Sequence, residues 1–92
     1  MKLTNSDIVY LAKNYFTSDE VEKEWLQHAI YDDCQKIRQG MLIDHEVEIS
    51  TRELYLDQIR WWQEREHYAM CQLLVDSADR YEIDIKEFGL DS

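Results

Sequence analysis

The sequence predicts an all-α fold: an antiparallel helical hairpin with an extra short N-terminal helix, which dimerises into a four-helix bundle. The 92 residues include no proline and only 2 glycines, so little interrupts a helix. Apolar side chains recur at helical spacing in three segments. In the last segment they cover most of the helix circumference, which predicts that a second subunit encloses it. At this length residues 1–92 are expected to form a single helical domain.

The first helix is expected over residues 6–16, after an N-cap at Asn5 or Ser6. Its apolar stripe consists of Ile8, Leu11, Ala12, Tyr15 and Phe16. The second helix is expected over residues 19–39, because acidic side chains fill its first turn and complement the helix dipole. Gly40 is expected to end it. Its core stripe consists of Leu26, Ile30, Cys34, Ile37 and Met41.

The third helix is expected over residues 51–81, beginning at a cap formed by Ser50 or Thr51. Such a helix would be about 45 Å long, at 1.5 Å per residue. Its polar side chains cluster on one narrow face at Gln58, Arg65, Gln72 and Asp76. Residues 42–50 and 81–85 alternate apolar and acidic side chains, so they form either a small two-stranded ribbon or loops.

The charge and the two cysteines limit the classes of partner. With 20 acidic and 10 basic residues, the net charge is −10, which opposes binding to nucleic-acid phosphates. The charge suits a cation-handling surface, a basic protein partner or solubility alone. No apolar run approaches membrane-spanning length, and no apolar run follows Lys2 as in a secretory signal. We therefore expect no membrane and a reducing cytoplasm, where Cys34 and Cys71 act as small buried hydrophobes.

A carboxylate and an imidazole, Glu64 and His67, stand three residues apart in the third predicted helix. Residues at this spacing share a helix face, so both side chains could reach one point. Di-iron carboxylate bundles use two Glu-x-x-His motifs and two further Glu. Because this chain has one such motif, a second copy would have to complete the site. If the turn of the hairpin centres near residue 45, Glu24 lies within about 3 Å of the level of Glu64 along the bundle axis.

Residues 64–70, Glu-Arg-Glu-His-Tyr-Ala-Met, resemble the helical metal-binding segment of the ferritin-like superfamily, and most closely that of the encapsulated ferritins. In that family an earlier Glu is followed seven residues later by Tyr and then Asp, as Glu24 is followed here by Tyr31. The resemblance implies that Glu24, Glu64 and His67 bind iron, with Tyr31 beside them as a further catalytic residue.

The resemblance further implies a ferroxidase: dimers that assemble into a ring, oxidise Fe(II) at a di-iron centre between subunits and deliver iron to an encapsulin shell. The chain departs from the family in three respects. The interval between Glu24 and Glu64 is longer, an extra N-terminal segment is present, and residues 88–92 differ from an encapsulin-targeting tail.

Two other classes of protein fit the same composition. The first is a small acidic helical interaction protein, such as a phage-type inhibitor that imitates nucleic acid and has no metal site. The bases interleaved with acids in residues 64–66 and 79–82 count against it. The second is a structural or regulatory helical dimer with no site at all.

Overall fold

The computed structural model describes residues 4–85, and within them it contains helices and no strand. The elements are, in order, α1 (Asn5–Ala12), the 3-10 turn η1 (Tyr15–Thr17), α2 (Glu20–His45), α3 (Thr51–Glu64) and α4 (Tyr68–Arg80). The all-α prediction is confirmed, and the two-stranded ribbon does not form. The tail considered for encapsulin targeting, residues 88–92, lies outside the described residues.

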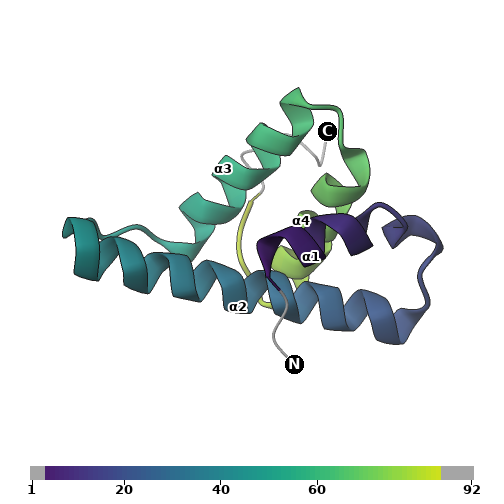
Figure 1. Ribbon diagram of the computed structural model, residues 1–92, viewed down its shortest axis with the longest axis horizontal. Helices are drawn as coiled ribbons and strands as arrows, with labels where there is room; N and C mark the ends of the chain where they lie inside the picture. Colours follow the sequence, from purple (N-terminus) through teal and green to yellow (C-terminus); the bar gives the residue numbers. More distant parts are fainter. Residues whose placement is uncertain (1–3, 86–92) are drawn as a thin grey trace.

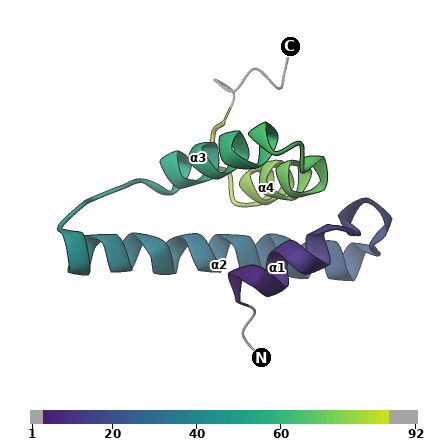
Figure 2. The same ribbon diagram turned by 45° about the horizontal axis from the view of Figure 1, so that its top comes forward.

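The long helix α2 forms the base on which the other helices pack. Its 26 residues should span about 39 Å, which matches the longest dimension of the molecule, 40 Å. Figure 2 shows α3 and α4 side by side above α2, while α1 lies against the N-terminal half of the same helix. The chain reaches α3 from one end of α2 through residues 46–50 (Figure 1).

The core is centred on α4, which contacts α1, η1, α2 and α3. Its fully buried side chains include Met70, Leu73, Leu74 and Ala78. The other helices contribute Ile8, Ala12, Tyr15, Leu26, Ile30, Cys34, Leu54, Tyr55 and Ile59. The predicted apolar stripes are therefore confirmed over most of the first two helices. Phe16 and Met41 are exceptions, since Phe16 is 58% exposed and Met41 belongs neither to the core nor to the side chains packed against it.

The prediction of one helix over residues 51–81 is wrong, because the chain reverses at residues 65–67. Glu66 adopts a left-handed backbone conformation with φ of 57°. The His67 N–H donates to the Trp62 carbonyl at 3.0 Å, and the Glu66 N–H donates to the Gln63 carbonyl at 3.0 Å. These two bonds form the Schellman motif that ends many helices. It is usually marked by glycine in the left-handed position, and here glutamate occupies that position.

The break also changes the expected hairpin. Because α4 folds back against α3, most of the apolar circumference predicted for one long helix is enclosed by the chain itself, whereas Trp61 and Tyr68 stay exposed. A second subunit is no longer needed to explain most of that apolar pattern. Dimerisation into a four-helix bundle stays a prediction.

The prediction that Gly40 ends the second helix is also wrong, since α2 continues to His45. A Cβ atom added at Gly40 would meet nothing within 4 Å, so no neighbour forces the chain to turn there. Glycine inside a helix costs about 1 kcal/mol relative to alanine but does not end it. The helix ends instead at Glu46, which has φ of 55°.

A buried polar side chain, Gln27, joins three of the elements. Its Nε2 donates to the Tyr15 hydroxyl at 2.8 Å, and its Oε1 accepts from the Arg80 Nε at 2.6 Å. The Gln27 carbonyl accepts from the Ser77 hydroxyl at 2.7 Å, and Ser77 Oγ lies 2.8 Å from the Tyr55 hydroxyl. Satisfied buried hydrogen bonds of this kind fix the relative positions of helices.

Candidate functional site

The three residues predicted to bind iron and the predicted catalytic residue Tyr31 occupy different elements of the chain. Glu24 and Tyr31 lie on α2, Glu64 is the last residue of α3, and His67 is the N-cap of α4. Within residues 4–85, no three His, Cys, Asp or Glu side chains come close enough together to hold a metal ion. The predicted centre combines groups from two chains, so iron binding stays a prediction.

The geometric basis of the Glu-x-x-His motif is lost at the break between α3 and α4. Glu64 and His67 belong to different helices, so the rule that places residues three apart on one face does not apply to them. His67 Nδ1 accepts a hydrogen bond from the Met70 N–H at 3.3 Å. The His67 ring also packs edge-on against Trp62, with ring centroids 5.2 Å apart. His67 thus contacts the C-terminal end of α3 and caps the N-terminal end of α4.

The two predicted residues on α2 hold α2 against α4 and the turn that follows it. The Glu24 carboxylate lies 3.4 Å from the Arg80 guanidinium in a largely exposed ion pair. The Tyr31 ring stacks on Tyr81 with centroids 4.2 Å apart and an interplanar angle of 14°. The Tyr81 hydroxyl lies 2.7 Å from His28 Nδ1. Glu24 and Tyr31, seven residues apart on α2, therefore both contact the C-terminal end of α4 and the turn after it within one chain.

Replacing Glu66 by Gly is expected to raise the free energy of unfolding by about 0.5–1 kcal/mol, because glycine adopts the left-handed conformation without steric cost. Replacing Glu64 by Gly is the matched control, since Glu64 has helical geometry at the end of α3. That change should lower stability by up to about 1 kcal/mol. Urea unfolding followed by circular dichroism measures both. A lower stability for Glu66→Gly would contradict the Schellman break.

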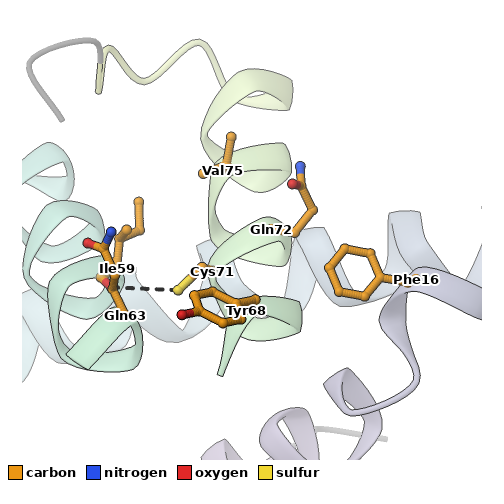
Figure 3. Close-up of a pocket in the computed structure, with 7 residues that line it drawn as sticks. All are labelled: Phe16, Ile59, Gln63, Tyr68, Cys71, Gln72 and Val75. Atoms are coloured by element: carbon orange, nitrogen blue, oxygen red, sulfur yellow. Dashed lines mark hydrogen bonds between the residues drawn. The ribbon is translucent and has the colours of Figure 1, made fainter. Parts of the chain in front are cut away.

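An apolar pocket of about 210 Å³ opens where η1 meets α3 and α4. Figure 3 shows its lining residues, Phe16, Ile59, Gln63, Tyr68, Cys71, Gln72 and Val75. The Cys71 thiol donates to the Ile59 carbonyl at 3.7 Å, and burial raises the pKa of this thiol. A protonated thiol is a weak nucleophile, so the pocket offers apolar contact rather than reactive groups.

The C-terminal end of α2 extends beyond the packed core. We call residues 41–49 the α2 tip. Every buried residue of α2 lies in its first fifteen positions, at Leu26, Gln27, Ile30 and Cys34. The tip carries three exposed aliphatic side chains, Leu42 (56%), Ile43 (76%) and Val47 (42%). Figure 1 shows this end of α2 reaching past α1 and α4.

The α2 tip has a fixed shape, because hydrogen bonds join both arms of its turn. Arg38 Nε donates to the Ile49 carbonyl at 2.7 Å. Arg38 Nη1 and Gln35 Nε2 both donate to the Thr51 hydroxyl, at 3.1 and 2.9 Å. An open groove of about 220 Å³ runs along these arms, lined by Gln35, Arg38, Gln39, Leu42, Glu48 and Ile49.

The surface charge is dominated by carboxylates. Within residues 4–85 the acidic side chains are exposed except for three that are half-buried, Glu22, Asp33 and Asp76. Several basic groups are directed to the chain's own oxygens instead. Arg38 donates to the Ile49 carbonyl, and Arg52 Nε donates to the Asp84 carbonyl at 2.7 Å. Lys13, Lys36, Arg60, Arg65 and Arg80 are exposed, but exposed carboxylates outnumber them, so the described surface carries more negative than positive charge.

No protein-family model, curated protein or solved structure matches this chain. None of the described helices combines the length and the apolar character needed to cross a membrane. The exposure of the α2 tip is not predicted from the sequence. The sequence signal in this segment is the alternation of apolar and acidic residues at positions 42–50, which is compatible with a strand or a loop.

Proposed function

We propose that this protein is a small acidic helical interaction protein that binds a basic surface of another protein. The observation that carries the proposal is the unequal placement of charge: carboxylates face solvent, whereas Arg38 and Arg52 bond to the chain's own backbone. With a net charge of −10, the chain would attract a basic partner over a distance set by ionic strength.

A nucleic-acid-binding protein is a partner class that fits this surface. Such proteins present lysine and arginine side chains that contact phosphates. Exposed carboxylates on a helical scaffold could bind these lysine and arginine side chains in place of phosphates. The acidic chain itself would not bind DNA or RNA. Electrostatic complementarity of this kind mainly accelerates association and suppresses wrong partners.

The test is capture on the immobilised chain from a lysate of the encoding organism, followed by reconstitution with the purified captured protein. We expect a saturable complex with a basic protein, weakened at least about tenfold when salt rises from low to high ionic strength. The control is a variant in which three exposed acids outside the α2 tip and the α2–α4 contact are neutralised, Glu20→Gln/Glu64→Gln/Glu82→Gln. A reconstituted complex with an acidic partner, or one insensitive to salt, would contradict the proposal.

A di-iron site between two copies is the competing proposal, and it rests on the sequence resemblance. Anaerobic addition of Fe(II) followed by air distinguishes the two, with ferric absorbance and molar mass as readouts. Because Glu64 and His67 belong to different helices, we expect oxidation of Fe(II) no faster than in buffer and an unchanged molar mass. Rapid oxidation that is lost in Glu64→Ala/His67→Ala would support the iron site and overturn our preference.

A further inference from the structure

We infer that the α2 tip is the docking surface for the apolar face of a basic amphipathic helix of a partner protein. The inference rests on the proposed function and adds the location of the contact and the kind of segment that occupies it. It is carried by exposed aliphatic side chains, by unbalanced acidic charge and by a preformed groove, all within residues 41–49 and the adjoining part of α2.

The aliphatic side chains of the tip have no role in the core. Leu42, Ile43 and Val47 are 56%, 76% and 42% exposed, and none belongs to the core or packs against it. Gly40 meets no neighbour that a Cβ would touch, so this part of α2 is open on that side as well. Grouped exposed aliphatic side chains with polar neighbours are typical of protein contact sites.

The charge of the tip selects the partner. Asp44, Glu46 and Glu48 are exposed between the aliphatic side chains, and no Lys or Arg occurs between Arg38 and Arg52. A second copy would bring the same carboxylates together and would add another net charge of −10. A segment with lysine or arginine around an apolar stripe matches both the aliphatic and the acidic groups.

The groove gives the partner's side chains a place to bind. Leu42 and Ile49 contribute apolar side chains to its lining, and Glu48 contributes a carboxylate. Its other lining residues are Gln35, Gln39 and Arg38, whose guanidinium is already bonded to the Ile49 carbonyl and the Thr51 hydroxyl. The hydrogen bonds from Arg38 to Ile49 and Thr51 hold its two walls together before any partner arrives. Recognition of an amphipathic helix commonly combines an apolar groove with anchors repeated at helical spacing. A preformed surface also lowers the entropic cost of binding.

The test uses a fluorescent synthetic peptide of leucine and lysine, with leucine at helical spacing, added to the full chain at low salt. Binding is followed by anisotropy, and backbone amide shifts locate the contact. We expect saturable binding with the largest shifts in residues 41–49. The variant Leu42→Gln/Ile43→Gln/Val47→Gln should weaken binding at least about tenfold, or about 1.4 kcal/mol.

A matched variant removes exposed apolar side chains at the other end of α2. Val21 and Trp25 are 77% and 46% exposed, and Val21→Gln/Trp25→Gln should leave the affinity within about twofold. A peptide of the same composition with its leucines spread around the helix, and one with glutamate in place of lysine, should bind at least about tenfold more weakly. Circular dichroism verifies that both variants keep the fold.

The outcomes separate the docking surface from the proposed function. Binding that the tip variant leaves unchanged, while Glu20→Gln/Glu64→Gln/Glu82→Gln weakens it, would overturn the docking surface and keep the acidic interaction protein. Absence of binding to any basic peptide at low salt would overturn the docking surface, and a captured partner that is acidic or insensitive to salt would overturn the proposed function as well. A doubled molar mass of the free chain that disappears in the tip variant would replace the basic helix by a second copy.

Discussion

Replacement of Leu74 by Ala is expected to lower the free energy of unfolding by about 2–5 kcal/mol. Leu74 is 0% exposed on α4, the helix that contacts every other element of the core. Its truncation removes apolar contacts and leaves a cavity that the packed helices fill only in part. Since domains are usually stable by only about 5–15 kcal/mol, this one change should move the unfolding midpoint strongly.

Urea unfolding followed by circular dichroism measures the effect, and Leu42→Ala is the matched control. The same substitution at the α2 tip, where Leu42 is 56% exposed, should change stability by less than about 1 kcal/mol. A loss at Leu42 equal to that at Leu74 would mean that the tip belongs to the core. The pair therefore tests the fold and the openness of the proposed docking surface together.

The second large effect is a loss of stability at alkaline pH, caused by buried groups that must stay neutral. Burial raises the pKa of the Cys34 thiol from 9.0 to about 11. Burial also raises the pKa of the Tyr15 and Tyr55 hydroxyls above their ordinary value of 10.0, and the hydrogen bond to Asp76 raises that of Tyr15 further. In each case the folded state favours the protonated form.

The unfolded chain therefore ionises first as pH rises, and the folded state loses stability. The contribution of Cys34 is fully present below pH 9 and declines above it as the pH approaches about 11, whereas those of the tyrosines decline above pH 10. At about 1.4 kcal/mol per pKa unit, Cys34 alone accounts for about 3 kcal/mol by the end of this range.

Urea unfolding at a series of pH values from neutral to alkaline measures the slope. Cys34→Ala should be less stable at neutral pH, because it leaves a small cavity, but its stability should fall less steeply above pH 9. Tyr68→Phe is the control, since this side chain is 58% exposed and should leave the slope unchanged. An identical slope in Cys34→Ala and the unmodified chain would show that the thiol does not cause the loss.

The helical class and most of the core could be predicted from apolar spacing. Ile8, Ala12 and Tyr15 in the first segment are buried, as are Leu26, Ile30 and Cys34 in the second, because each repeats on one helix face. This spacing reports which side of a helix is covered. It does not report which helix covers that side. The sequence therefore predicts that a second subunit covers the apolar faces that α3 and α4 in fact cover for each other.

The C-terminal ends of α2 and α3 and the candidate site could not be predicted, because they depend on backbone conformation and packing rather than on apolar spacing. Glu66 is a good helix former by its residue type. Its left-handed backbone is evident only from the structure, in its φ of 57° and in the two hydrogen bonds that end α3. Without that break, Glu64 and His67 read as neighbours on one helix face. The exposure of Ile43 depends on where α3 and α4 pack along α2, which local sequence does not specify.

Three glutamates stand where glycine would be most stable. Glu46, Glu66 and Glu82 follow α2, α3 and α4 and have φ of 55°, 57° and 57°. Each has a steric cost in the left-handed region and places a negative charge beside the negative end of a helix dipole. At these three helix ends glycine would favour folding stability, whereas glutamate adds negative surface charge, and the sequence has glutamate. The molecule therefore holds a reserve of stability at its surface that can be recovered without altering the core, at the expense of the carboxylates that a basic partner would meet.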